Sequence, residues 1–206
     1  MRKLKDLVKG TLRSVLTSAV AFTVSTGAAL AQVPSFAAPP AQPSTFMVGV
    51  NFAPPVTGAG DLFCITGSAS RLVKVKSIQL NGVASAAVTA AFNLVKRSTV
   101  DSGGTSTTPV GVPIDSAQVV PVATATMKAY TVVPTPGTSV GTISSRYLTL
   151  NTAAAGPTDD VSWVWTPTNL NSDVRLRNAT ESLCLNAPGT LTGATGISVE
   201  FLWTEQ

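Results

Sequence analysis

The sequence contains no histidine among its 206 residues and only two cysteines. The missing histidine excludes the commonest general base, the Ser-His-Asp and Cys-His arrangements, and most zinc sites. Charged residues are also scarce, at 12% against an ordinary share of about 25%. The surface must therefore be built mostly from Ser, Thr, Asn and Gly. We predict a protein that is not an enzyme and that holds no cofactor.

The net charge of +4 at pH 7 is concentrated at the N-terminus. Residues 1–31 hold five of the 14 basic side chains and one of the 10 acidic ones, which leaves nine of each sign in residues 32–206. A neutral domain lacks the basic stripe that neutralises nucleic-acid phosphates. Glycine-rich phosphate-binding motifs are also missing. We therefore predict neither a nucleic-acid partner nor a small-molecule substrate.

Residues 1–31 have the layout of a signal peptide. The first thirteen residues are basic, residues 14–31 carry no charge, and Ala29-Leu30-Ala31 matches the small-residue cleavage pattern. The alternative is a retained N-terminal arm, helical or extended, since apolar residues recur at helical spacing in the first twelve positions. Both interpretations stay open. Contact with a membrane would be transient and would occur only in the first of them.

A Pro/Ala-rich linker follows in residues 32–45, which contain four prolines and no charge. Proline fixes φ and removes a backbone donor, which favours an extended tether. We place the folded domain at residues 46–206. No charged residue occurs between Arg13 and Asp61, so part of this stretch is expected to lie against a partner surface.

The remaining sequence consists of short β-prone runs separated by turns rich in Gly and Pro, the pattern of an all-β fold. Apolar and polar side chains alternate in residues 88–94, 161–165 and 197–203. Large aromatic side chains in these runs would fill much of the core. The candidates are Phe92, Trp163, Trp165, Phe201 and Trp203. We predict an antiparallel two-sheet sandwich of jelly-roll-like type.

In residues 72–81 the apolar side chains change parity half-way, between Val75 and Ile78. One extra residue in a β-bulge would bring both halves of the run to one face of the sheet. We therefore predict a bulge near Lys76 or Ser77.

Cys64 and Cys184 are 120 residues apart and belong to no metal-binding spacing. Since both lie in β-prone runs, they can form one disulfide, or they can remain as two buried thiols packed as small hydrophobes. No base or cationic neighbour in its run activates Cys64 as a nucleophile. We predict a structural role for both cysteines and no metal site.

Other polar residues have ordinary explanations. Asp159 and Asp160 are neighbours, which point to opposite sides on an extended chain, so we expect a solvated turn and no pair of catalytic carboxylates. Lys96 and Arg97 follow a strand, and we expect them to cap its exposed end in solvent. The glycosylation pattern that begins at Asn178 is short enough to recur by chance.

Five segments of the sequence resemble stretches of a known group of proteins. They are Ile65–Ile78, Asn93–Thr99, Gly103–Pro109, Ala129–Tyr130 and Val199–Glu205. The first is similar to an ITGSA-T-x-V-x-V-x-x-I stretch, and the last to WTEE-type ends, of uncharacterised structural proteins of tailed phages and prophages of proteobacteria. The resemblance implies a virion component, such as a capsid decoration, head-fibre or tail-surface protein. Its partners would be other virion proteins or copies of itself, for example in a trimer. It carries no catalytic residues to transfer.

Two functional hypotheses differ in what they expect of the leader, residues 1–31. The first is a structural protein of the virion. The second is an exported periplasmic, secreted or cell-surface protein processed after Ala31, because phage particles assemble in the cytoplasm and a true signal peptide argues against them. As a variant of the second, Trp163, Trp165 or Trp203 could stack on sugars in a glycan-binding module, although alternation places them inside.

Overall fold

The structure is a computed structural model, and it describes residues 42–118, 120, 122–152, 162–168 and 173–206. The predicted leader and most of the predicted linker lie outside these ranges, as do Asp159 and Asp160. The regular structure of the described residues consists of β-strands alone, which confirms the all-β prediction, and these residues contain no helix long and apolar enough to cross a membrane. The strands are β1 (Ser44–Phe52), β2 (Gly60–Thr66), β3 (Val73–Ala84), β4 (Val88–Arg97), β5 (Thr105–Thr107), β6 (Val112–Pro113), β7 (Thr126–Val132), β8 (Ser139–Thr152), β9 (Trp163–Trp165), β10 (Val174–Leu176), β11 (Ser182–Ala187) and β12 (Ala194–Glu205).

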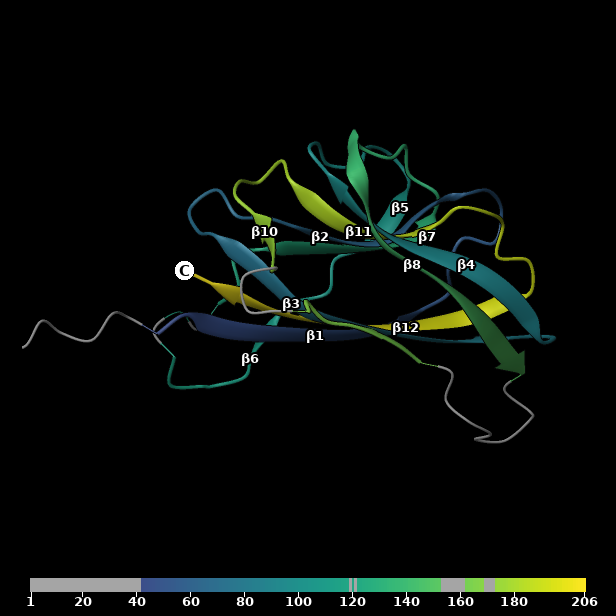
Figure 1. Ribbon diagram of the computed structural model, residues 1–206, viewed down its shortest axis with the longest axis horizontal. Coiled ribbons are helices and arrows are strands. Elements are labelled where there is room, and N and C mark those ends of the chain that lie inside the picture. Colours follow the sequence, from purple (N-terminus) through teal and green to yellow (C-terminus); the bar gives the residue numbers. More distant parts are fainter. Residues whose placement is uncertain (1–41, 119, 121, 153–161, 169–172) are drawn as a thin grey trace, which may run out of the picture. The chain divides into compact units, whose positions relative to one another are not determined.

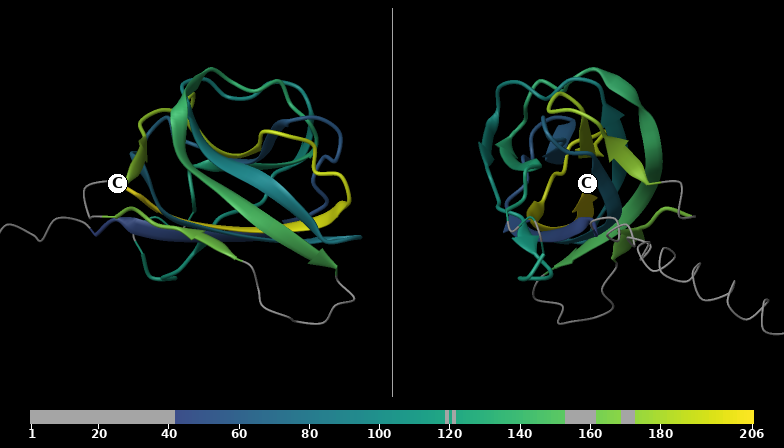
Figure 2. Two further views of the ribbon diagram at one scale, coloured as in Figure 1. Left: turned by 45° about the vertical axis from the view of Figure 1, so that its right-hand side comes forward. Right: turned by 90° about the vertical axis from the view of Figure 1, so that its left-hand side faces the viewer.

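The strands form one continuous sheet that curls into a half-barrel (Figures 1 and 2). Its order is β5-β7-β2-β11-β4-β8-β3-β12-β1-β6, and the short strands β9 and β10 pair with β3 beside this path. β8 runs antiparallel to β4 and meets β3 in parallel over its last two residues, Asn151 and Thr152. It therefore connects two parts of the sheet. We call β6, β1, β12 and β3 the β1 half, and β5, β7, β2, β11 and β4 the β2 half.

Alternation predicted the core faces of β4 and β12 correctly. In β4, Ala90, Phe92 and Leu94 are buried, while the side chains between them are partly exposed. In β12 the predicted face between Ile197 and Trp203 is buried, and the polar residues between its members are exposed or partly exposed. Because side chains alternate along a strand, each half of the sheet contributes one apolar face to a shared core.

The predicted bulge in β3 is present. Leu202 of β12 pairs with Ser77, whereas the next residue, Trp203, pairs with Val75, so Lys76 is the extra residue. Since Lys76 is skipped, the apolar side chains before and after it face the core despite their opposite parity.

Four of the five predicted core aromatics are buried. Phe92, Phe201 and Trp203 are fully enclosed and Trp163 nearly so, whereas Trp165 is half-buried at the margin of the core. Trp165 ends the short strand β9, which pairs with β3 alone among the described strands, so no further strand covers its ring from the other edge.

β2 is buried on both faces. Phe63 and Ile65 face the main core, while Cys64 between them faces the opposite side of the sheet. That side is covered by the loops 98–104 and 133–138, which are joined to each other by an isolated β-bridge. The cover creates a second, smaller interior on the convex side of the β2 half.

Candidate functional site

Cys64 and Cys184 are joined by a disulfide in this smaller interior. β2 and β11 are antiparallel neighbours, and the two cysteines are direct register partners whose Cα atoms lie 4.1 Å apart. With Tyr130 they form a cluster separate from the main core. Of the two arrangements left open by the sequence, the structure contains the bridge. A disulfide-bonded Cys64 offers no thiolate for nucleophilic attack.

A buried ion pair lies beside the disulfide. Arg97 Nε donates to Asp61 Oδ2 at 2.5 Å, and Arg97 Nη2 donates to Asp61 Oδ1 at 2.6 Å, which makes the pair bidentate. Asn186 Nδ2 donates to the same Oδ1 at 2.7 Å, and Arg97 Nη1 donates to the carbonyl oxygen of Gly137 at 2.8 Å. Both charges are therefore paired and hydrogen-bonded, as charges in a protein interior must be.

The expectation that Arg97 caps an exposed strand end in solvent is wrong. Arg97 is only 5% exposed. It shares the parity of Val95 on β4, and this places it on the face that the two loops cover. The local pattern around Lys96 and Arg97 shows a strand end but carries no information about loops that fold over it.

Asp101 brings a second carboxylate to the same place. Its Oδ1 accepts the N–H of Gly137 at 2.9 Å and lies 3.7 Å from Arg97 Nε, while its Oδ2 lies 3.2 Å from Cys64 Sγ. A disulfide sulfur has no hydrogen to donate, so this contact gives the charged Oδ2 no hydrogen bond. Burial raises the pKa of Asp101 to about 6, and the nearby charge of Asp61 acts in the same direction, against the bond from Gly137 and the charge of Arg97.

Tyr130 encloses the cluster from the side of β7. Its side chain is fully buried. Burial raises the pKa of the Tyr130 phenol, and the negative charges of Asp101 and Asp61 add to the effect, since both disfavour a phenolate. The surroundings of Tyr130 therefore favour the neutral phenol.

The ligand-type atoms of Asp61, Cys64, Asp101 and Cys184 all lie within 4.8 Å of one another, close enough to surround a metal ion. Their bonding does not fit that use. The metal ligand is a thiolate, and both sulfurs are bonded to each other. The Asp61 carboxylate is already held by the Arg97 guanidinium. The arrangement instead ties β2, β4 and β11 to the loops that cover them.

A further buried carboxylate, Glu205, lies in the β1 half. It accepts the backbone N–H groups of Thr124 at 3.0 Å and Ala125 at 2.9 Å, the hydroxyl of Thr124 at 2.6 Å, and Nε1–H of Trp203 at 3.0 Å. Among the described residues no cation forms a salt bridge with it. Glu205 thus fixes the segment before β7 to the end of β12 through neutral donors alone.

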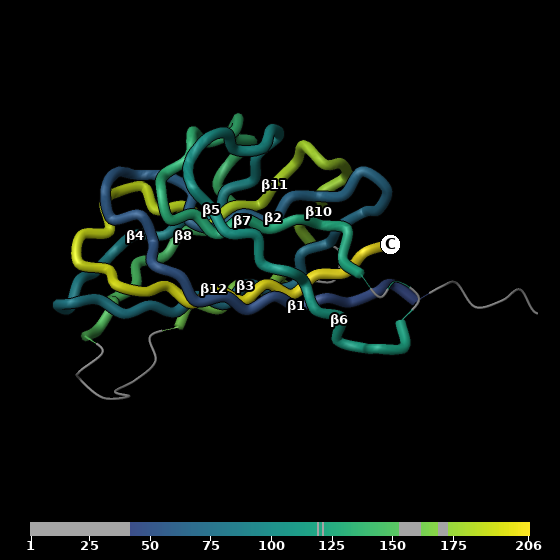
Figure 3. The backbone as a smooth tube through the Cα atoms, turned by 180° about the vertical axis from the view of Figure 1, so that it is seen from behind, coloured from purple at the N-terminus to yellow at the C-terminus, as the bar shows by residue number. Residues whose placement is uncertain are grey.

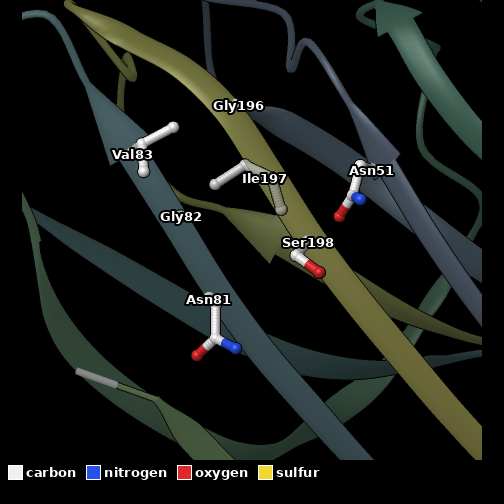
Figure 4. A pocket seen from close by; sticks show the side chains of 7 residues that line it. All are labelled: Asn51, Asn81, Gly82, Val83, Gly196, Ile197 and Ser198. Carbon is white, nitrogen blue, oxygen red and sulfur yellow. The ribbon is translucent and has the colours of Figure 1, made fainter. Parts of the chain in front are cut away.

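The exposed face of the β1 half carries a row of neutral polar side chains (Figure 4). Asn51, Ser198 and Asn81 are register partners across β1, β12 and β3. With Val83 and Ile197 they line a hollow of about 250 Å³. No lining residue is an acid, a base or a cysteine. The hollow offers hydrogen bonds and some apolar surface, and nothing that would transfer a proton.

The three tryptophans do not form a sugar-stacking platform. Trp203 is fully buried, Trp163 nearly so, and only part of the Trp165 ring reaches the surface. Stacking on a sugar needs an exposed ring face, which neither Trp163 nor Trp203 offers. The amide of Asn178 is also engaged in the fold, because its Oδ1 accepts the backbone N–H and the hydroxyl of Thr180.

Sequence reasoning missed the three buried carboxylates. Asp61 gave a signal that was available, because it is the first charge after Arg13 and it stands at the start of an apolar run. A charge at the head of a fully buried strand requires a partner. Asp101 and Glu205 gave none, since the backbone N–H groups that they accept come from segments far away in the sequence.

Comparison with known proteins adds no relative. No family model, no curated protein and no solved structure matches this chain.

Proposed function

We propose that the chain is a non-enzymatic structural protein of a virion, exposed on its surface as a capsid decoration, head-fibre or tail-surface component. One observation carries the non-enzymatic part: Asp61, Glu205 and the two cysteines are engaged within the fold. Asp61 is paired with Arg97, Glu205 is held by neutral donors, and the two sulfurs form a disulfide. Groups held in this way stabilise a fold and are not free to act on a substrate. The resemblance to phage structural proteins supports the virion location.

The surface supports a role in assembly with other virion proteins or with copies of the same chain, for example in a trimer. Large apolar side chains are exposed on the segment around β6 and along β8. They are Val110, Val112 and Ile114 on the first, and Val140, Ile143 and Tyr147 on the second. Single exposed apolar residues are ordinary, but groups of them mark interaction surfaces.

We also propose that the curled sheet is a sandwich of jelly-roll-like type. The β1 half and the β2 half enclose a shared core, as the two sheets of a sandwich do. A jelly-roll-like sandwich is a common architecture of capsid proteins. An N-terminal arm, helical or extended, would then serve to attach the domain to the particle.

The composition of purified particles tests this proposal. Mass spectrometry of virions should detect peptides of this chain at a stoichiometric level, including peptides from residues before Ala31. Intact, infectious particles that lack the chain would refute the virion assignment.

The second candidate is an exported periplasmic, secreted or cell-surface protein, and the Cys64–Cys184 disulfide favours it. Disulfides persist in oxidising compartments, which a protein with a cleaved signal peptide reaches. N-terminal sequencing of the protein from its native host separates the two candidates. A start at Gln32 supports export, whereas a start at Met1 or Arg2 supports the retained arm.

A further inference from the structure

An apolar strip lies close to the start of the described domain. Val112 of β6, Met47 of β1 and Leu202 of β12 are register partners across three neighbouring strands (Figure 3). Val112 is 62% exposed and Met47 40%, and Ile114, just after β6, is 57% exposed. We call these four residues the β6 strip. Three of its members are exposed large side chains, and Leu202 is partly exposed.

A hollow of about 430 Å³ adjoins the strip and is lined by Ile114 and by residues 42–43, where the described chain begins. Two of its polar side chains are already engaged within the domain. Gln118 Oε1 accepts the N–H of Thr45 at 3.0 Å, and Asp115 Oδ1 accepts a backbone N–H of its own turn. An occupant would find these two groups already bonded and would bind mainly through apolar contact.

The occupant must lie on the face of the sheet and not extend it. Ile114 donates its N–H to Thr45 O, toward β1, so Pro113 presents the opposite, free edge. Proline has no N–H to offer to an added strand, and its presence on an edge blocks strand addition.

We propose that residues 32–41 of a second copy of this chain bind the β6 strip. This segment lies outside the described residues and ends at the hollow, and it carries no charge. It contains two large apolar residues, Val33 and Phe36, which match the apolar strip. It also remains in the protein whether or not the leader is removed after Ala31.

The prolines of the segment favour a neighbouring copy over the segment's own domain. Pro39 and Pro40 disfavour a reversal of the chain directly before Gln42. In an extended conformation ten residues span about 30 Å, enough to leave one domain and reach another. A stable interface buries about 800 Å² per partner, and residues 32–41 of the neighbouring copy would extend the contact beyond the four residues of the strip.

Mixing two complementary full-length variants tests this proposal. The first variant changes residues 32–41, here called the arm, by Val33→Lys and Phe36→Lys. The second variant changes the β6 strip by Val112→Lys and Ile114→Lys. We call them the arm variant and the strip variant. Sedimentation should show self-association of the unmodified chain and a dissociation constant at least about tenfold weaker in each variant alone. An equimolar mixture should form a one-to-one complex, because one variant supplies the intact strip and the other the intact arm.

Val132→Lys, at an exposed valine on β7 outside both groups of exposed apolar residues, is the matched control and should leave self-association unchanged. Self-association that survives in either variant overturns the proposal, and so does a mixture that stays monomeric. An unmodified chain that is monomeric at all concentrations also overturns it, because residues 32–41 would then bind the strip of their own domain or none at all. The inference rests on the proposed assembly role. Failure of this inference is distinguishable from failure of the proposed virion function, because the composition of purified particles is measured in a separate experiment.

Discussion

Two regions of the molecule bury carboxylates in different ways. Asp61 and Asp101 lie under the loops of the β2 half, where a guanidinium and a disulfide accompany them. Glu205 lies in the β1 half and is held by backbone N–H groups, a hydroxyl and an indole. The first region balances a charge with an opposite charge. The second stabilises a charge with oriented neutral donors.

The difference predicts how each region fails. Removing the cation from the first region leaves an unpaired buried charge, which is among the most costly single changes in a protein. Removing the charge from the second region leaves neutral donors, each of which loses only part of its hydrogen bonding. Substitutions in the β2 half should therefore be more damaging than matched substitutions in the β1 half.

The largest effect is expected for Arg97→Met. It leaves Asp61 buried without its cation and should lower the free energy of unfolding by about 3–5 kcal/mol. Chemical denaturation followed by fluorescence measures the change, and Arg146→Met at an exposed site of β8 is the control. The double variant Asp61→Asn, Arg97→Met should be more stable than Arg97→Met alone. A double variant no better than the single one would show that the charge is not the cause.

The next largest effect is expected when the disulfide is removed by Cys64→Ala together with Cys184→Ala. The bridge closes a loop of 120 residues, and its loss should cost about 2–4 kcal/mol. Reduction of the unmodified protein should lower stability to a similar degree. If the reduced and oxidised proteins denature at the same concentration of denaturant, the bridge does not stabilise the β2 half.

A smaller effect is expected for Glu205→Gln, which keeps the shape of the side chain but presents an amide to the donors of Thr124 and Ala125. The loss should be about 1–3 kcal/mol, with a change in the emission of Trp203, whose indole N–H donates to the same carboxylate. Glu200→Gln, on the exposed face of the same strand, is the control and should have almost no effect. A cost above that of Arg97→Met would reverse the comparison.

The smallest effect concerns pH. The pKa of Asp101 is raised from 3.8 to about 6 in the folded protein, so the native state holds this proton more tightly than the unfolded chain does. Stability from this group is therefore greatest below about pH 4 and declines as the pH rises toward 6. Asp101→Asn should flatten the dependence of Tm on pH in this window. An identical profile for the variant and the unmodified protein would show that Asp101 does not titrate there.

The sequence was sufficient to predict features that depend on local periodicity. The alternation in β4 and β12 reports burial directly, and the change of parity around Lys76 predicts the bulge because a sheet has a strict period of two. Phe92, Phe201 and Trp203 followed from the same rule. Trp165 did not, since its burial depends on a neighbouring strand that the sheet does not provide.

Features that depend on distant partners were beyond reach. Arg97 looked like a solvated strand end because nothing in the local sequence shows that residues 98–104 and 133–138 fold back over it. The disulfide could be stated only as one of two options, because the pairing of β2 with β11 decides it. The same holds for Glu205, whose donors belong to the segment before β7.

The sheet order also sets a condition on when the molecule can form. β12 is the final strand, and it lies between β1 and β3, pairing with both along most of their length. While the ribosome is still making residues 194–205, β1 and β3 have no partner between them. Pairings over such sequence distances are slow to form and leave strands exposed meanwhile. β1 and β3 can therefore join in one sheet through β12 only after residues 194–205 have been made, which makes β12 the strand that commits the β1 half to its structure.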